Sequence, residues 1–216
     1  MLRACQTFVA AMTPSSITDD QSVVFSNIRQ ALAGKSDRTP LPDWEDAAIV
    51  CRPPRDFATP SDHFRFKFEA AGGIVVDGWA GLTTWLQQQN LQRGYVDPAC
   101  ASALAGTPFE IETSFDRSRV DDYQFGITRA AAAIAETGSL VLNETQTSSR
   151  LGALAPWVHI AIVESSQIVP SMPSAIAQFG MDRATLFVTG PSKTADVEGI
   201  LIKGVHGPGI QVCCLV

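Results

Sequence analysis

The stretch LFVTGPSKTADVEGILIKGVHGPGIQVCCLV, residues 186–216, contains the signals that decide the fold class. Its apolar start, Leu186–Val188, is typical of a strand, and a Gly-Pro-Ser-Lys-Thr loop follows it. We predict a short amphipathic helix next, with Val197, Ile200 and Leu201 on its buried side, and then a Gly/His/Pro turn and a terminal strand. This order predicts a β-loop-α-β unit, the building block of α/β proteins.

The chain upstream of this stretch alternates between helices and apolar strands in the same way. An alanine-rich segment that ends near Ala135 is predicted as a compact helix, and Ser139–Leu142 and residues 159–163 are predicted as strands. Further predicted elements are helices over residues 22–32, 61–71, 79–92 and 173–179 and strands over residues 74–76 and 109–113. Strands that are apolar on consecutive residues and separated by helices indicate an α/β fold with an open, mostly parallel sheet and helices on both faces.

The length and composition predict one soluble domain. The chain has 216 residues, of which 45% are hydrophobic and 18% charged, enough for one substantial core. We predict a flexible N-terminal arm over residues 1–21 and a single α/β domain over residues 22–216. Because no apolar run approaches the roughly 20 residues that span a bilayer, and the apolar stretch near the N-terminus is too short for a secretory signal, we expect no membrane span and a cytoplasmic location.

Charge and cysteine content exclude several classes of function. The net charge of -6 and the pI near 5.0 argue against nucleic-acid binding, which requires a basic face. The five cysteines are scattered and contain no Cys-x-x-Cys, which argues against a zinc site, an iron–sulfur cluster or a disulfide framework. The adjacent Cys213 and Cys214 should face opposite sides of a strand, as small core residues. No metal and no cofactor are predicted.

The loop over residues 190–196 is the predicted ligand-binding site. It lies between a strand and the predicted helix, where backbone N–H groups and the helix dipole favour an anion, and its candidate contacts are Gly190, Ser192, Lys193, Thr194 and Asp196. A nucleotide-binding P-loop is excluded, because that motif needs glycine where Ser192 and Phe187 stand. Two carboxylates, Asp196 and Glu198, would compete with the anion for the helix dipole. The alternative is a well-capped helix with Lys193 in solvent.

Four other residues are candidates for the site. Glu136 is the best candidate for a catalytic carboxylate, although it could equally accept hydrogen bonds from neighbouring loop amides. Gly138, in the same turn, is a candidate ligand contact. His206 follows the anion loop and, with Arg150, is a possible second contact for the ligand. Residues 143–150 form a polar loop, either a lid or a long surface turn. His159 begins a core strand and is expected to be structural.

Three segments together resemble one family. They are AIAETGSLVL at residues 133–142, PWVHIAIV at residues 156–163, and TGPSKTADVE at residues 189–198 with GVHGP at residues 204–208. In this order they resemble the LUD-domain family, over about residues 120–216. The resemblance implies a fold of the ribose-isomerase and CoA-transferase-like type. It also implies a place in a bacterial operon whose iron–sulfur proteins oxidise L-lactate to pyruvate.

We therefore expect an accessory component of such a system that binds a small carboxylate or another anion, with iron–sulfur subunits as its partners. The cysteine spacing agrees with the resemblance in giving this chain no cluster of its own. One alternative is an enzyme of the CoA-transferase-like type that uses Glu136. Another is a ligand-sensing module without catalysis. Similarity of fold does not decide between them, because function depends on the site.

Overall fold

The computed structural model describes residues 14–35, 56–179, 184–195 and 200–216. The chain divides into two compact units, Met1–Trp44 and Glu45–Val216. In the first unit, helix α1 (Pro14–Leu32) begins earlier than the predicted helix over residues 22–32 and is followed by Gly34 in the left-handed conformation, with φ of +85°. Its apolar side chains are exposed to solvent, among them Val24, Phe25 and Ile28.

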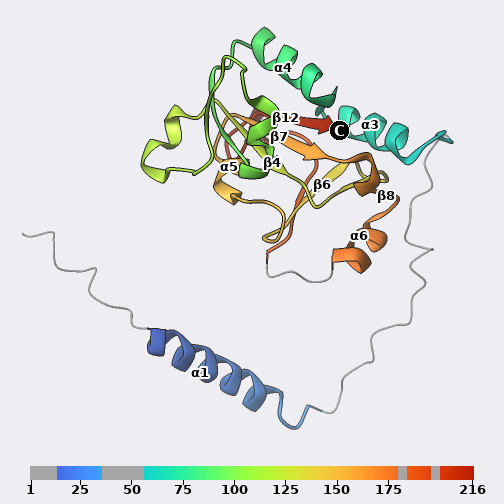
Figure 1. Cartoon of the computed structure of the whole chain (residues 1–216). Coiled ribbons are helices and arrows are strands. Elements are labelled where there is room, and N and C mark those ends of the chain that lie inside the picture. The colour runs from blue at the N-terminus through green and yellow to red at the C-terminus, as the bar shows by residue number, and fades with distance from the viewer. Residues whose placement is uncertain (1–13, 36–55, 180–183, 196–199) are drawn as a thin grey trace, which may run out of the picture. The chain divides into compact units, whose positions relative to one another are not determined.

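The second unit is built on a six-stranded sheet (Figure 1). Its strands lie in the spatial order β1 (Ile74–Asp77), β12 (Ile210–Leu215), β7 (Val158–Val163), β4 (Phe125–Arg129), β2 (Arg93–Val96) and β3 (Glu110–Glu112). All neighbouring pairs run parallel. Strand β7 is buried along its whole length and β12 at every residue after Ile210, as consecutive apolar residues predicted.

Helices cover both faces of this sheet. Helix α3 (Pro60–Ala70) contributes Phe64 and Phe68 to one core, which also contains Cys213. Helix α4 (Gly78–Gln88) packs on the opposite face, in a second core that contains Cys214. The two cysteines therefore point to opposite sides of β12, and the predicted α/β architecture is confirmed.

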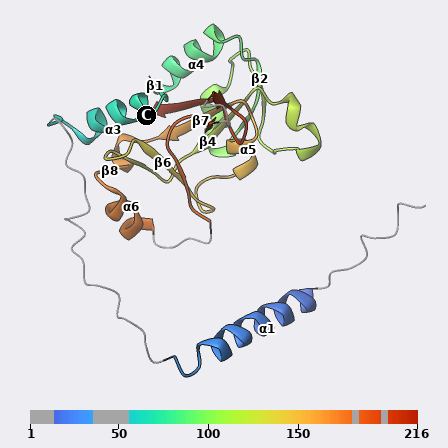
Figure 2. The same cartoon turned by 180° about the vertical axis from the view of Figure 1, so that it is seen from behind.

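Helix α3 starts where local sequence signals place it. The hydroxyl of Thr59 accepts a hydrogen bond from Asp62 N–H at 3.1 Å, and Pro60 occupies the first turn, where it needs no partner for the missing N–H. The remaining helical elements are α5 (Arg150–Leu154), α6 (Met172–Phe179), η1 (Pro98–Leu104), η2 (Arg117–Asp122) and η3 (Ser165–Gln167). Helix α6 lies on the opposite side of this unit from α4 (Figure 2).

A second, four-stranded sheet packs against the first core. Its strands lie in the order β8 (Ile168–Val169), β5 (Ala132–Ile134), β6 (Ser139–Leu142) and β9 (Leu186–Val188). Strands β5 and β8 are parallel, and β6 runs antiparallel to both β5 and β9. Leu140 and Leu142 of this sheet share a core with α3 and the large sheet.

The alanine-rich segment is strand β5, so the helix predicted there is wrong. Ala132 and Ile134 face one core and Ala133 faces another, which is the two-residue period of a strand. Hydrogen bonds to neighbours on both sides and burial on both faces outweigh the helix propensity of alanine, an advantage of less than about 1 kcal/mol per residue. The small side chains allow two layers to approach this strand closely.

The helix predicted after the 190–196 loop is also wrong over its described part. Strands β10 (Lys193–Ala195) and β11 (Leu201–Lys203) form an antiparallel hairpin instead. Thr194 and Ile202 are paired across it, and β-branched residues favour strands. Asp196, Val197 and Glu198 lie outside the described residues.

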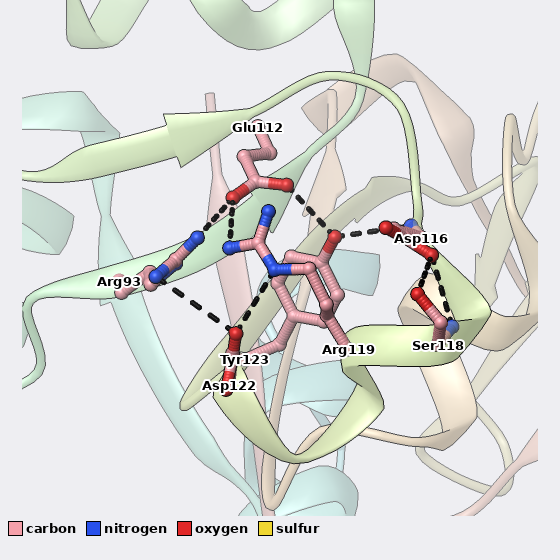
Figure 3. Close-up of polar contacts among 7 residues, drawn as sticks. All are labelled: Arg93, Glu112, Asp116, Ser118, Arg119, Asp122 and Tyr123. Atoms are coloured by element: carbon pink, nitrogen blue, oxygen red, sulfur yellow. Dashed lines mark hydrogen bonds and ion pairs between the residues drawn. The ribbon is translucent and has the colours of Figure 1, made fainter.

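The edge strand β3 is held by a network of charged side chains (Figure 3). Glu112 accepts hydrogen bonds from Arg93 (2.5 Å), Arg119 (3.1 Å) and Tyr123 (2.9 Å). Asp122 adds a second carboxylate, 3.0 Å from Arg119. This network anchors η2 beside a three-residue strand, and a short, charged edge disfavours pairing with another chain. Among the described residues, no helix is long and apolar enough to cross a bilayer.

Candidate functional site

Ser192, at the centre of the predicted anion loop, is bonded to the protein itself. Its N–H donates to Pro208 O at 2.9 Å, and its carbonyl oxygen accepts from Gly204 N–H at 3.0 Å. Its hydroxyl accepts a hydrogen bond from His206 N–H at 3.3 Å. These groups, which the sequence suggested for holding an anion, fasten the loop to the turn that follows β11.

Gly190 and Lys193 attach the same loop to the end of α3. Gly190 has φ of +75°, and a Cβ atom at this position would lie 2.6 Å from Ala71 O. The Nζ of Lys193 donates to that same carbonyl oxygen at 2.5 Å. A cation beside the last carbonyl groups of a helix is favourable, because it complements the negative end of the helix dipole. Lys193 therefore has a structural partner.

The other predicted ligand contacts are dispersed. Thr194 belongs to β10, while the exposed His206 contributes its backbone N–H to the Ser192 contact. Arg150, at the start of α5, donates to Glu144 at 2.7 Å and is half-exposed. Asp196 lies outside the described residues.

Glu136 caps a helix. Its Oε2 accepts a hydrogen bond from Met172 N–H at 3.2 Å, at the first residue of α6, where a carboxylate stabilises the helix start. Gly138, in the same turn, has φ of +65°, and a Cβ atom there would lie 2.4 Å from Phe68 N. The turn therefore packs closely against α3. The contact with Met172 N–H supports the structural role of Glu136, that of a hydrogen-bond acceptor for a backbone amide.

A cavity of about 290 Å³ lies between the start of α3 and the turn before Glu136. Its lining includes Phe57, His63, Ala135 and Pro170. His63 stacks on Phe57, with ring centroids 4.5 Å apart, and its Nε2 has no hydrogen-bond partner among the described residues. Burial and the charge of Lys67 lower the pKa of His63, while Glu136 opposes that change.

His159 is fully buried in the large sheet, as its position in a core strand predicted. Its Nε2 lies 2.9 Å from Thr128 Oγ1, and its Nδ1 lies 2.8 Å from Gln211 Nε2. Gln211 is the cross-strand partner of His159 on β12, and Thr128 lies two residues beyond the register partner of His159 on β4. Burial lowers the pKa of His159 to about 4, because both partners are uncharged and cannot balance an imidazolium.

Sequence reasoning missed a charged pair at the carboxyl ends of β2 and β4. Asp97 directly follows β2 and Arg129 ends β4, and Arg129 Nε lies 3.5 Å from Asp97 Oδ1. The Asp97 side chain is only 2% exposed, whereas that of Arg129 is 45% exposed. The sequence does contain a signal for Asp97, because it is a polar residue directly after an apolar strand. That strand, β2, was not predicted, so the signal could not be used.

The topology makes this position distinctive. Strands β2 and β4 are neighbours, yet the next strand of this sheet along the chain lies on opposite sides of them: β3 follows β2 on one side, and β7 follows β4 on the other. Connections that diverge in this way define a topological switch point, and ligands of open α/β sheets bind outside the carboxyl ends of the strands at such a point.

The polar loop over residues 143–149 lies over the same strand ends. Thr147 Oγ1 donates to Arg129 O at 2.9 Å, and Ser148 Oγ lies 2.6 Å from the hydroxyl of Tyr95 in β2. Asn143 and Thr147 are both buried. This segment is therefore fastened across β2 and β4.

Cys100, in η1, is a neutral neighbour of this pair. Burial, reinforced by the charge of Asp97, raises the pKa of its thiol to about 11, although Arg129 acts in the opposite direction. A thiol with this pKa is protonated at neutral pH and is a poor nucleophile. Within the described ranges, no group of three or more histidine, cysteine or carboxylate side chains is placed to hold a metal ion.

Comparison with known proteins identifies the family. A family model described as the LUD domain matches residues 88–216. Lactate utilization protein C of Bacillus licheniformis is 39% identical over 152 residues, which are 67% of this chain and 55% of the relative. The protein of the same name from Bacillus subtilis is 38% identical over 98 residues, covering 42% of this chain and 41% of the relative. The chain spans about half the length of the relatives that it matches.

A solved structure shares the fold. A DUF162 family protein from Deinococcus radiodurans aligns with a TM-score of 0.57 and 19% sequence identity, covering 76% of this chain and 100% of the other. At this identity the likeness concerns the fold alone. The family match covers more than half of the sequence and includes the three segments that carried the resemblance. This chain belongs to the LUD-domain family.

Proposed function

We propose that the protein is an accessory component of a cytoplasmic lactate-oxidation system, in which iron–sulfur partner proteins convert L-lactate to pyruvate and this chain binds a small carboxylate. The observation that carries the proposal is the 39% identity, over two thirds of the chain, to a relative named lactate utilization protein C. That electron transfer belongs to the partners is supported by the five cysteines of this chain, which have no cluster spacing.

Deletion of the gene in the source organism tests the assignment to lactate oxidation. We expect slower growth on L-lactate as sole carbon source, restored by the full chain, with growth on glucose unchanged. Affinity capture of the tagged full chain from a native lysate should also recover iron–sulfur proteins. Normal growth on lactate together with isolation of this chain alone would contradict the proposal.

A second candidate is an enzyme of the CoA-transferase-like type that uses Glu136. It is supported by the cavity beside Ala135, where His63 Nε2 lacks a partner among the described residues. Acyl-CoA and free carboxylic acids are the substrates to test. Turnover that Glu136→Gln abolishes without unfolding the protein would favour this candidate, whereas turnover unchanged by Glu136→Gln would count against it.

A further inference from the structure

We propose that Arg129 and Asp97 form the binding site for a small 2-hydroxy carboxylate at the switch point between β2 and β4. Arg129 would bind the carboxylate group, and Asp97 would position Arg129 and accept the hydrogen bond of the ligand hydroxyl. The choice of L-lactate as the first ligand rests on the proposed function. The location of the site rests on the geometry of the two side chains and on the topology of the sheet.

The guanidinium of Arg129 has hydrogen-bond donors to spare. Its ion pair with Asp97 uses Nε, and among the described residues neither Nη1 nor Nη2 has a partner. The side chain is 45% exposed at the carboxyl edge of the sheet, so a ligand from solvent can reach it. Two parallel N–H groups match the two oxygens of a carboxylate, and such bidentate pairs are among the strongest hydrogen bonds in proteins.

Asp97 supplies the second, independent observation. Its Oδ1 accepts from Ala99 N–H at 2.9 Å and faces Arg129, but its buried Oδ2 has no partner among the described residues. A buried carboxylate oxygen without a donor is unfavourable, so the site as it stands lacks one hydrogen-bond donor. The arginine and the carboxylate together call for a ligand that accepts at one end and donates at an adjacent atom.

A 2-hydroxy acid meets both requirements. Its carboxylate accepts from Arg129, and its hydroxyl, one carbon away, donates to Asp97. A 2-oxo acid has no proton at that position, and its carbonyl oxygen would face the carboxylate oxygen of Asp97, which is repulsive. A plain carboxylic acid would bind Arg129 but leave Asp97 unsatisfied. Sites built to bond a hydroxyl reject analogues that lack it, because their polar group stays unpaired.

The surrounding contacts keep the pair in place. Asp97 is held by the Ala99 amide at the start of η1, and the main chain of Arg129 is held by Thr147. Both contacts leave the Nη groups of Arg129 unused. Strand ends and a fastened loop provide the rigid support that a preorganised site needs.

Isothermal titration of the full chain at pH 7.5 with L-lactate, pyruvate and propionate tests the proposal. We expect saturable binding of L-lactate and weaker binding of the other two acids. Arg129→Gln should weaken L-lactate binding about tenfold or more, the loss expected for a charged hydrogen-bonded pair. Arg117→Gln is the matched control, because Arg117 is exposed and lies outside this site, and it should bind like the wild type.

Asp97→Asn tests the selectivity separately. The asparagine amide can donate where the carboxylate accepts, so the preference for L-lactate over pyruvate should disappear or reverse. If this variant does not fold, the affinities of the wild-type protein for the three acids still test the role of Asp97. Equal affinity for L-lactate, pyruvate and propionate would overturn the role of Asp97 in selectivity.

Two results would overturn the site itself: no binding of any of the three acids, or binding unchanged in Arg129→Gln. Binding lost in Lys193→Gln but retained in Arg129→Gln would place the ligand at the 190–196 loop instead. These outcomes are separable from the proposed function. A protein that binds lactate through Arg129 but whose deletion leaves growth on lactate normal would retain the site and lose the assignment to lactate oxidation.

Discussion

His159 shows how a single buried residue links stability to pH. In the folded protein the pKa of His159 is about 4, below the ordinary value of 6.5. As the pH falls, His159 of the unfolded chain therefore binds its proton before His159 of the folded protein does. Stability should therefore decrease from about pH 7 toward pH 4, by about 3 kcal/mol in total from this residue. Above pH 7 the residue is neutral in both states and contributes no slope.

Urea unfolding between pH 8 and pH 5 measures this effect. His159→Gln should lose most of the slope between pH 7 and pH 5, at some cost in stability at pH 8 from altered packing. His206→Gln removes an exposed histidine and should keep the slope of the wild type. An unchanged slope in His159→Gln would show that other groups cause the pH dependence.

Gly138 can be compared with Gly106, because both have positive φ values, of +65° and +79°. Alanine at Gly106 meets nothing within 4 Å and should cost only the backbone strain of about 1–2 kcal/mol. Alanine at Gly138 would place Cβ 2.4 Å from Phe68 N, which should add about 1–3 kcal/mol of overpacking.

Denaturant midpoints of Gly138→Ala and Gly106→Ala measure the difference between the two sites. Equal losses would mean that the turn at Gly138 can move away from α3 without cost. The comparison also tests whether glycine in the Glu-Thr-Gly-Ser segment serves packing, as the contacts indicate.

At the residue scale, sequence alone predicted roles that depend on a residue's own strand. The opposite orientation of Cys213 and Cys214 and the burial of His159 follow from the two-residue period of a strand. The pairing of Asp97 with Arg129 depends on which strands are neighbours. That information lies in the sheet order, which no local pattern contains.

Among the secondary-structure elements, the hairpin β10–β11 places two lysines opposite each other. Lys193 is the cross-strand partner of Lys203, and like charges in that position are unfavourable. Lys203→Glu should therefore stabilise the hairpin by about 0.5 kcal/mol, which slows hydrogen exchange of its amides about twofold. The gain should shrink in high salt, because the exposed pair is screened.

Lys35→Glu provides the charge-matched control, since Lys35 is exposed and lies in the first unit. It changes the net charge equally and should leave hairpin exchange unaltered. Unchanged exchange in Lys203→Glu would contradict the prediction and indicate that the bond from Lys193 to Ala71 already keeps the two ammonium groups apart.

Helices with a clear amphipathic period and apolar strands such as β9 were predicted, whereas the short strands β5, β10 and β11 were not. Leu82 and Leu86 of α4, which fill the core, lie four residues apart within the helix predicted over residues 79–92. The three-residue strands β5, β10 and β11 have too few residues to show a period, and their hydrogen-bond partners come from distant parts of the sequence. Alanine content suggested a helix at β5, and the spacing of Val197, Ile200 and Leu201 suggested one after the 190–196 loop. In both segments tertiary pairing overrode that preference.

At the scale of the whole molecule, the described core residues all belong to the second unit. The three hydrophobic clusters extend from Phe64 to Leu215 and include no described residue of Met1–Trp44.

A chain truncated to start at Glu45 should therefore unfold cooperatively. Its free energy of unfolding should lie within about 0.5 kcal/mol of that of the full chain, as for other changes away from a core. Circular dichroism should lose the helical signal of α1 while the urea midpoint stays the same. A midpoint that falls clearly would mean that the apolar side of α1 stabilises the second unit, and Phe25→Ser in the full chain should then lower the midpoint by a similar amount.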